Sequence, residues 1–231
     1  ANSIEIGLLS GIFSLVNLSQ IFWSKIISSE AQKILQKHAE RHGVEFILNA
    51  KSVSFLGSGD FEGIKINEKE VKAPILAVGI GLESESVVLN GAGIEVRKGV
   101  VCDKFLQTSQ PDIFAAGDCA EFEDVVLEKH MRYGNWTNAI MQGKTAALNM
   151  LGEKQEFRIL SSYSTSLFGK DIVFIGDVER ASADVVEQKV LDAENSVEIF
   201  KRDGRAVGAV IIGDTAKRTE ITNKIKNRED F

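Results

Sequence analysis

The chain has 231 residues, with 33 acidic and 27 basic side chains and a formal net charge of −6. This length allows one large domain or two smaller ones, and a composition that is 44% hydrophobic and 26% charged excludes wholesale disorder. The acidic balance is spread along the chain, which argues against a nucleic-acid partner. Two cysteines without CxxC spacing and three histidines exclude a disulfide framework and argue against a structural metal site.

An apolar stretch opens the chain, from Ile6 to Ile27. Its first basic residue, Lys25, follows the apolar part, whereas a signal peptide begins with basic residues. Serine, asparagine and glutamine residues interrupt the stretch, so it falls short of the roughly 18 apolar residues of a membrane span. We therefore expect the end of a helix over 4–10, a buried strand over Ile12–Val16, a cytoplasmic location and no membrane partner.

The next segment predicts a helix followed by strands. Ser29 and Gln32 have the spacing of a capping box, and Gly43 stands where a helix commonly ends. Strands are expected over residues 44–48, in an antiparallel meander over 53–66, and over Pro74–Gly79. The last run is wholly apolar, which is typical of a strand buried on both faces of a parallel sheet. This order predicts a βαβ-type nucleotide domain with an antiparallel insertion.

The second half of the chain predicts two further units. A buried strand over 113–116 ends in Gly117-Asp118, and a helix from Trp136 to Leu151 ends at Gly152, followed by a polar boundary over 152–156. Beyond it the pattern indicates an α+β module. Its expected features are strands over 172–175, 197–201 and 206–212, a hairpin turn at Asp203-Gly204, and a last helix that is capped by Asp214 and carries Ile221 and Ile225.

The most informative motif is the string Thr108-Ser109-Gln110-Pro111-Asp112-Ile113-Phe114-Ala115-Ala116-Gly117-Asp118. It ends in Gly-Asp at the carboxyl end of an expected strand, where ligands bind in open α/β sheets. Gly117 permits close backbone approach, and the Asp118 carboxylate can accept hydrogen bonds from sugar or polyol hydroxyls. The alternative interpretation of the last two residues is an ordinary Gly-Asp turn.

The whole string resembles the second FAD-binding motif of the flavin-dependent pyridine-nucleotide oxidoreductases, the family of NADH oxidases, rubredoxin reductases and the flavin module of nitrite reductase. The resemblance implies that Asp118 holds the ribityl chain of FAD, with Thr108, Ala116 and Gly117 beside it. It extends over nearly the whole chain. Other segments that share it are Leu76–Gly79, Gly99–Asp103, Asn135–Ala139 with Gln142-Gly143, and Gly204–Val210 with Gly213-Asp214.

The helix that begins at Trp136 could stabilise charge on a bound flavin in such a protein. The resemblance places Asn135, Trp136 and Thr137 at the pyrimidine edge of the flavin ring. Unpaired N–H groups and the helix dipole there can stabilise negative charge on a reduced flavin by up to about 2 kcal/mol. The alternative is a core helix with a buried tryptophan.

Residues 1–7 resemble the latter part of the family's second dinucleotide fingerprint, with Ser3 in place of the third glycine. The resemblance implies that Glu5 lies near the nicotinamide of NAD. It puts Asn17 where an acidic residue usually bonds the adenosine ribose, and Gly79 and Gly81 at the NAD/FAD junction. The earlier fingerprint glycines and the first FAD-binding domain of the family have no counterpart in this sequence, so the chain resembles the C-terminal portion of a family member.

Cysteines and histidines carry no catalytic assignment. Cys102 and Cys119 are both interpreted as small buried residues. His38 and His42 lie one turn apart on a helix, but without a third ligand in pattern they are interpreted as surface residues. His130, in the loop before the flavin helix, is a candidate for contact with the cofactor.

These observations together predict an α/β fold, with partial Rossmann-like FAD/NAD(P)-binding domains and a C-terminal α+β interface domain. The expected domains are 1–79 (partial NAD-binding), 80–155 (C-terminal segment of the FAD-binding domain) and 156–231 (interface). The expected function is that of an NADH-dependent FAD oxidoreductase that passes electrons to a protein or small-molecule acceptor, with a homodimer or a partner chain as possible assemblies. Two alternatives stay open: a non-catalytic fragment or subunit that needs a partner chain to hold flavin, and a nucleotide-binding module without redox function.

Overall fold

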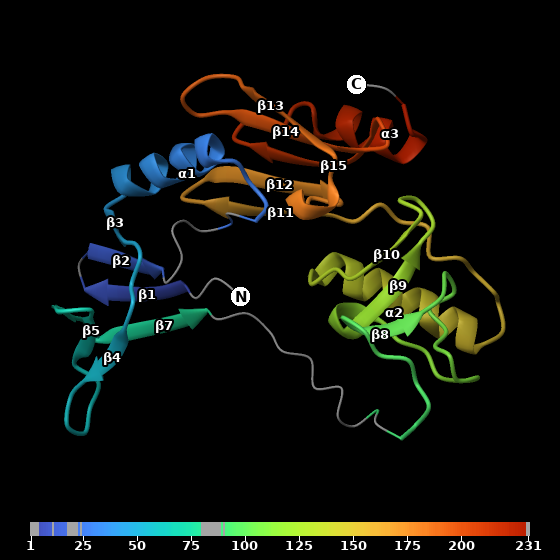
Figure 1. Ribbon diagram of the computed structural model, residues 1–231, viewed down its shortest axis with the longest axis horizontal. Helices are drawn as coiled ribbons and strands as arrows, with labels where there is room; N and C mark the ends of the chain where they lie inside the picture. The colour runs from blue at the N-terminus through green and yellow to red at the C-terminus, as the bar shows by residue number, and fades with distance from the viewer. Residues whose placement is uncertain are drawn as a thin grey trace.

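The computed structural model describes residues 5–10 and 12–17 by their backbone, and residues 23, 25–79, 89 and 91–229 with their side chains. The described residues form three regions (Figure 1): an N-terminal region up to residue 79, a middle region over 89–160 and a C-terminal region over 161–229. Each region has its own β-sheet, and the N-terminal region has a second, smaller one. None of the helices in this described part of the chain is long and apolar enough to cross a membrane.

The N-terminal sheet has the strand order β3-β2-β1-β7. Its strands are β1 (Glu5–Ser10), β2 (Ile12–Asn17), β3 (Val44–Ile47) and β7 (Ile75–Gly79). β2 and β3 are parallel, whereas β1 runs antiparallel to both β2 and β7. The helix expected over 4–10 is therefore wrong. A short apolar run fits a buried strand as well as a helix, and pairing on both sides satisfies the backbone groups of β1.

Strand β7 also differs from its prediction. It is not buried on both faces, because Ile75 and Val78 are each 54% exposed. The strand stands at the end of the sheet, with β1 beside it. Its apolar sequence is compatible with a central position in a sheet. Burial also requires side chains packed on both faces of the strand, and the described residues do not cover Ile75 and Val78 in this way.

Helix α1 (Ser29–Arg41) connects β2 to β3, with its apolar face turned to the C-terminal sheet. Ser28 is its N-cap and accepts a hydrogen bond from Ala31 N at 3.1 Å, so the capping box expected at Ser29 and Gln32 is wrong by one position. Gln32 instead donates to the carbonyl of Ile27 at 2.9 Å. The expected helix end is confirmed, since Gly43 has a φ of +84° that favours glycine.

The expected meander is confirmed as an antiparallel sheet of three strands. These are β4 (Val53–Leu56), β5 (Gly63–Ile66) and β6 (Lys69–Lys72). Its small core contains Ile64 and Ile66.

The middle region combines a three-stranded sheet with one long helix. The strands are β8 (Val100–Cys102), β9 (Ala120–Asp124) and β10 (Lys129–Met131), and the helix is α2 (Trp136–Met150). The strand expected over 113–116 is wrong, since only Phe114 forms an isolated bridge, to Gln107. A 3₁₀ turn, η2 (Gly117–Cys119), follows, and the strand begins after it. The expected end of α2 is confirmed by Gly152, whose φ is +93°.

The C-terminal region is an antiparallel sheet of order β11-β12-β15-β14-β13. Its elements are β11 (Ser162–Leu167), β12 (Lys170–Gly176), η3 (Arg180–Ser182), β13 (Val185–Val190), β14 (Ser196–Arg202), β15 (Arg205–Ile212) and α3 (Arg218–Asn227). The Asp203-Gly204 turn is confirmed, and so is the place of Ile221 and Ile225 on the last helix, where both are buried. Asp214 does not cap α3; its carboxylate accepts from Ala216 N at 2.9 Å, one turn before the helix begins.

Buried carboxylates of the C-terminal region hold the other two regions. Asp177, after β12, is 1% exposed and pairs with Lys129 of β10 at 2.9 Å. Glu198 of β14 accepts a hydrogen bond from Ser28 N at 2.9 Å and pairs with Arg180. The C-terminal sheet therefore contacts both the start of α1 and the strand that precedes α2.

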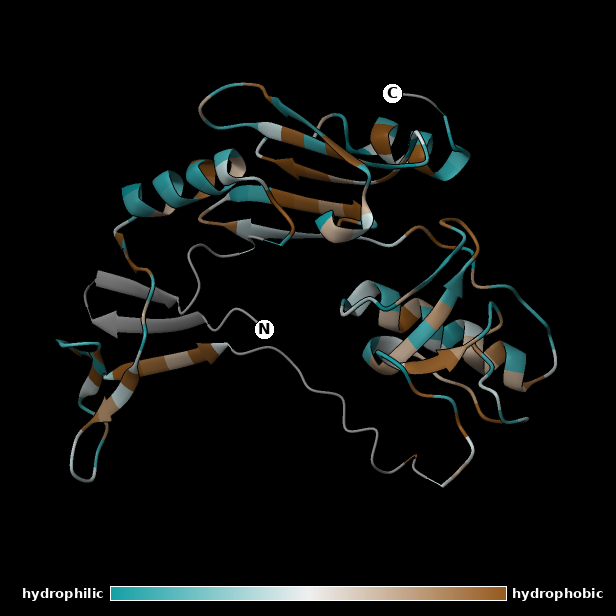
Figure 2. Cartoon of the chain, viewed as in Figure 1, coloured by the Kyte–Doolittle hydropathy of each residue, from teal (hydrophilic) through white to brown (hydrophobic). Residues whose placement is uncertain are grey.

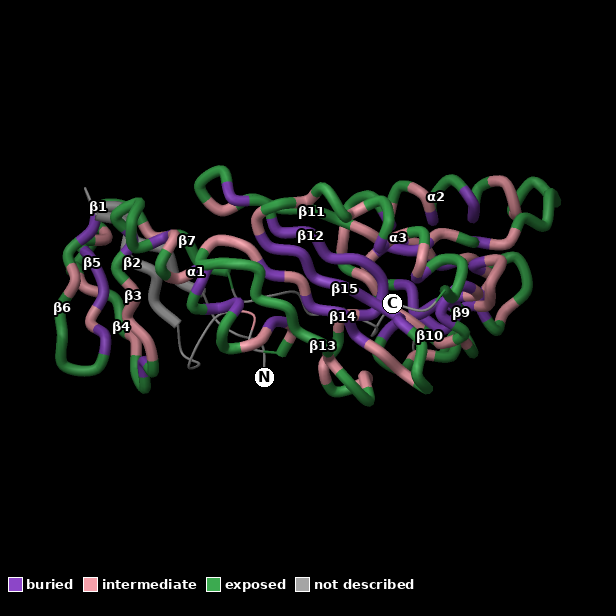
Figure 3. The backbone as a smooth tube through the Cα atoms, turned by 90° about the horizontal axis from the view of Figure 1, so that it is seen from above, coloured by how far each residue is buried: buried purple, intermediate pink, exposed green. Residues whose placement is uncertain are grey.

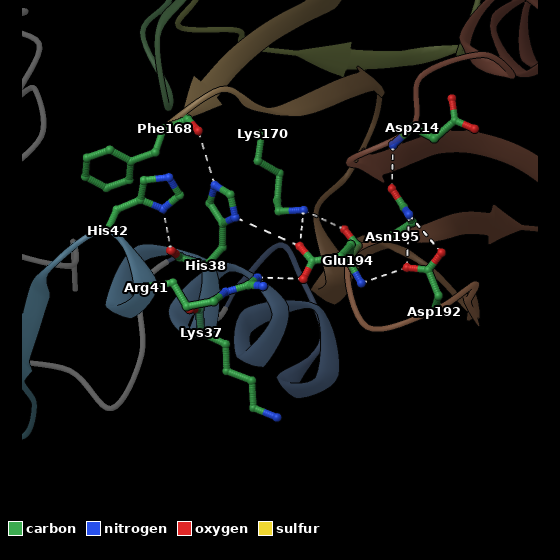
Figure 4. Close-up of polar contacts among 10 residues, drawn as sticks. All are labelled: Lys37, His38, Arg41, His42, Phe168, Lys170, Asp192, Glu194, Asn195 and Asp214. Atoms are coloured by element: carbon green, nitrogen blue, oxygen red, sulfur yellow. Dashed lines mark hydrogen bonds and ion pairs between the residues drawn. The ribbon is translucent and has the colours of Figure 1, made fainter.

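A second contact between α1 and the C-terminal region lies at the surface (Figure 4). Glu194 pairs with Arg41 at 2.6 Å and with Lys170 at 2.8 Å, and these cations lower the pKa of Glu194 to about 2. His38 contacts the same carboxylate at 3.9 Å, while the ring of His42 stacks on Phe168 with centroids 4.8 Å apart. The two helix histidines thus take part in the packing of α1 on the C-terminal region.

Candidate functional site

The Gly117–Asp118 turn lies against helix α2. Gly117 has a φ of +82°, and a Cβ atom added to it would stand 3.4 Å from the Cβ of Ala139 on α2. The left-handed backbone and the close packing both favour glycine at this position. The short distance between turn and helix brings two parts of the predicted flavin site together.

The carboxylate of Asp118 is partly buried and has no hydrogen-bond donor among the described residues. Gly134 lies next to it, since a Cβ atom built on that glycine would be 3.7 Å from Oδ2 of Asp118. A carboxylate with its lone pairs unused can accept several hydrogen bonds from hydroxyl groups of a ligand. The geometry therefore agrees with the chemistry expected of Asp118.

The N-terminus of α2 is capped and solvent-accessible. Asn135 is the N-cap; its Oδ1 accepts from Asn138 N at 2.9 Å and its Nδ2 donates to Ser161 Oγ at 3.0 Å. Trp136 is 81% exposed, so the alternative of a buried tryptophan is wrong, and Thr137 is exposed as well. The hydrogen bonds found among the described residues leave the N–H groups of Trp136 and Thr137 available to a ligand, at the positive end of the helix dipole.

Two cavities flank these residues. One, of about 700 Å³, lies between the middle and C-terminal regions; Gly134, Asn135 and His130 line it together with the stacked rings of Tyr163 and Phe174. The other, of about 430 Å³, lies beside β8, with a lining that includes Thr108, Ala116, Phe114 and Cys119. Both have the size of small-molecule sites. Of the predicted flavin residues, Asn135 lines the first cavity and Thr108 and Ala116 line the second, whereas Gly117, Asp118, Trp136 and Thr137 line neither.

The two cysteines differ in environment. Cys102 is buried as expected, and burial raises the pKa of its thiol to about 12, so it is unreactive. Cys119 is exposed, which makes the prediction of a buried residue wrong. It lies in the η2 turn and lines the cavity beside β8, and its carbonyl faces Gly99, where an added Cβ atom would stand 2.6 Å away.

Several buried polar groups near α2 have no partner among the described residues. They are the hydroxyl of Tyr133, both amide atoms of Asn138 and Nε2 of Gln142. Buried polar groups are usually satisfied, so these atoms indicate that a polar neighbour belongs here. These atoms are closed off from solvent, so they mark unused polar capacity within the packing around α2, close to the Asp118 turn.

The residues expected near NAD fall in one row across the N-terminal sheet. Glu5 pairs with Asn17 of β2 on one side and with Gly79 of β7 on the other. Asn17 and Gly79 end their strands, so the row lies at the carboxyl ends of β2 and β7, where ligands bind in α/β sheets. The side chains of Glu5 and Asn17 and the whole of Gly81 lie outside what the structure describes.

Two residues that contact the Asp118 turn had no role assigned from the sequence, although Gln142 belongs to the Gln142-Gly143 pair that shares the family resemblance. Gln142 and Arg132 bond the backbone of Gly117 and Asp118 directly. The signal for Gln142 was its place in the Gln142-Gly143 pair, but that resemblance did not indicate its contact with the turn. No sequence pattern pointed to Arg132, because its two acceptors come from distant parts of the chain.

The known proteins that this chain resembles in sequence and in structure are oxidoreductases and reductases. The sequence profile described as pyridine nucleotide-disulphide oxidoreductase matches residues 13–143. The chain is 25% identical to a nitrite reductase [NAD(P)H] of Bacillus subtilis over 223 residues, which cover 94% of this chain and 27% of that protein. It is 26% identical to a rubredoxin-NAD(+) reductase of Ectopseudomonas oleovorans over 207 residues, with 83% and 54% covered.

Solved structures share the fold. A ferredoxin reductase from Rhodopseudomonas palustris superposes with a TM-score of 0.80 at 18% identity, over 94% of this chain and 54% of that one. A water-forming NADH oxidase from Lactobacillus brevis does so with a TM-score of 0.76 at 21% identity, over 94% and 53%. The chain therefore spans between about a quarter and about half of the length of these relatives.

Proposed function

Because the chain belongs to the pyridine nucleotide-disulphide oxidoreductase family, we propose that it is the FAD- and NADH-binding C-terminal portion of a flavoprotein oxidoreductase. The observation that carries the proposal is the Asp118 turn. A carboxylate without a hydrogen-bond donor among the described residues stands there beside the capped, accessible N-terminus of α2, and its chain neighbours Ala116 and Cys119 line one ligand-sized cavity while Asn135 lines another. The same turn falls within the region that matches the family profile.

Each proposed contact has a distinct physical task. Asp118 accepts hydrogen bonds from the ribityl hydroxyls, with Thr108, Ala116 and Gly117 beside it. The first N–H groups of α2, at Trp136 and Thr137, stabilise negative charge at the pyrimidine edge of the ring. When bound, FAD supplies the chemistry of accepting electrons from NADH and passing them on, while the protein supplies position and electrostatics.

The NADH side of the proposal rests on the row formed by Glu5, Asn17 and Gly79, with Gly81 as its fourth member. Relatives named for NAD(P)H, nitrite and rubredoxin support NADH as the donor and a protein or small-molecule acceptor. The division into domains 1–79, 80–155 and 156–231 is part of the proposal and is supported by the separate sheets of the three regions. A cytoplasmic location and a homodimer or partner chain also belong to it.

The test of this proposal is flavin binding by the Asp118→Ala variant. The unchanged chain should take up FAD with the absorbance bands of bound flavin, and the variant should bind it at least about tenfold more weakly, because it loses charge-assisted hydrogen bonds. Glu123→Ala, an exposed acid on neighbouring β9, is the matched control and should bind as the unchanged chain does. Equal FAD affinity in all three proteins would contradict the assignment of Asp118.

A second candidate is a subunit or fragment that holds flavin only together with a partner chain. It is supported by the chain spanning about half or less of its relatives' length. It predicts that FAD added to this chain alone neither binds nor raises the melting temperature. FAD added together with the part of a relative that this chain does not match should do both. A rise in melting temperature with NADH and none with FAD would instead favour a nucleotide-binding module without redox function.

A further inference from the structure

The backbone of the Gly117–Asp118 turn is held at two atoms by side chains from different parts of the middle region. Oε1 of Gln142, on α2, accepts a hydrogen bond from Gly117 N at 2.7 Å. Nε of Arg132, between β10 and α2, donates to the carbonyl of Asp118 at 2.7 Å. One bond therefore holds the peptide that precedes Gly117, and the other holds the peptide that follows Asp118.

Gln142 makes its bond from a fully buried position. Its neighbours one turn away on the same face of α2 are Asn138 and Ala146, which are buried as well. Leucine would fill a similar volume, but it would leave the buried N–H of Gly117 without an acceptor, which is costly. The Oε1 acceptor of Gln142 is thus matched to the N–H group of Gly117.

Arg132 ties the same turn to the segment before β8. Besides the carbonyl of Asp118, its guanidinium donates from one Nη atom to the carbonyl of Lys98 at 2.6 Å. The side chain passes along Gly99, where an added Cβ atom would stand 3.3 Å from Cδ of Arg132 and 2.6 Å from the carbonyl of Cys119. A glycine at position 99 leaves the room that this crossing requires.

We propose that Gln142 and Arg132 are positioning residues that set the direction of the Asp118 carboxylate. With the peptides before Gly117 and after Asp118 held, and with Ala120 N bonded to the Gly117 carbonyl between them, the carboxylate turns mainly about its own side-chain bonds, which have few favoured settings. Gln142 also belongs to the helix whose first turn, at Trp136 and Thr137, faces the ring of the proposed flavin. The two flavin contacts are then parts of one rigid unit, and this inference rests on the proposed function.

The test compares Gln142→Leu with Gln142→Glu, which keeps an acceptor at the same place, and with Lys144→Ala, an exposed control on α2. The first measurement, amide hydrogen exchange at Gly117, needs no flavin. Gln142→Leu should accelerate this exchange at least about tenfold, whereas the other two variants should retain the protection. The second measurement is the FAD dissociation constant from quenching of flavin fluorescence, expected to rise about tenfold in Gln142→Leu and to recover in Gln142→Glu.

Arg132→Lys gives an independent test at an exposed position where folding is not at risk. Lysine cannot reach both carbonyl groups, so FAD should bind several-fold more weakly at an unchanged melting temperature. If the unchanged chain binds FAD and both Gln142→Leu and Arg132→Lys bind it equally well, the inference is overturned while the proposed function stands. If the unchanged chain binds no FAD, the proposed function fails, and so does the part of this inference that concerns flavin. Faster amide exchange at Gly117 in Gln142→Leu would still show that Gln142 holds the turn.

Discussion

Two strongly apolar strands of this molecule have opposite environments. In the C-terminal region, β15 lies between β12 and β14, and its residues from Ala206 to Ile212 are buried. In the N-terminal region, β7 stands at the end of its sheet with most of its residues exposed. The two runs are similarly brown in Figure 2, yet Figure 3 shows β12, β14 and β15 as one buried block. Apolar sequence alone therefore does not decide burial; the neighbouring layers do.

The largest expected effect tests this contrast in stability. Phe200→Ala, within the buried C-terminal core, should lower the free energy of unfolding by about 3–5 kcal/mol. Val78→Ala, on the exposed strand β7, should lower it by less than about 1 kcal/mol. Urea unfolding followed by circular dichroism measures both. If Phe200→Ala does not fold, Ile211→Val should still cost about 1 kcal/mol, and equal costs at positions 78 and 211 would contradict the comparison.

Two buried carboxylates sharpen the comparison between regions. Asp177 and Asp124 are each 1% exposed. Burial acts to raise the pKa of both, but hydrogen bonds from Lys129, Glu179 N and Ser182 outweigh it at Asp177 and hold its pKa below the ordinary value. At Asp124 burial prevails over the backbone donors of Leu127 and Val126, and the pKa is raised.

The same substitution should therefore act with opposite sign. Asp177→Asn should cost about 3 kcal/mol at neutral pH, because it leaves the charges of Lys129 and Arg202 with a neutral partner. Asp124→Asn should leave stability unchanged or raise it by up to about 1 kcal/mol, because no buried charge remains. Denaturant unfolding at pH 7 is the measurement, and a large loss in Asp124→Asn would contradict this account.

The pH dependence follows from the same two pKa shifts. The depressed pKa of Asp177 contributes stability that is present above its unfolded value, near 3.9, and is lost as pH falls through the folded value. The raised pKa of Asp124 contributes stability that is present below about 3.9 and is lost as pH rises through its folded value. Melting temperatures from pH 7 down to about 2 should show a shallower acid loss in Asp177→Asn than in the unchanged chain.

The smallest effect is expected at the surface contact between α1 and the C-terminal region. Glu194→Gln removes a carboxylate that pairs with Arg41 and Lys170, but the group is partly exposed and screened by water. The melting temperature should fall slightly at low salt and match the unchanged chain at about 0.5 M NaCl. A large loss that persists at high salt would show that this contact is as important as the buried Glu198.

Much of the local structure could be predicted because neighbouring residues decide it. The turn at Asp203-Gly204 and the helix ends at Gly43 and Gly152 depend on backbone conformations that glycine favours. The strand expected over 113–116 failed because pairing requires a partner, and the partner of this segment is a single bridge at Gln107. Similarly, the sequence of the run over 4–10 is compatible with a helix or a strand, and pairing with β2 and β7 decides for the strand.

For the candidate site, the sequence by itself determined the Thr108–Asp118 string, the start of α2 at Trp136 and the likeness to a flavoprotein family, because these are carried by residues adjacent in the chain. Only the tertiary structure decided that Gln142 and Arg132 hold the Asp118 turn, that Trp136 is exposed, and that Glu5, Asn17 and Gly79 form one row. Each of these depends on contacts between segments far apart in sequence, and the free energy of such contacts comes from burial and pairing that no local pattern contains.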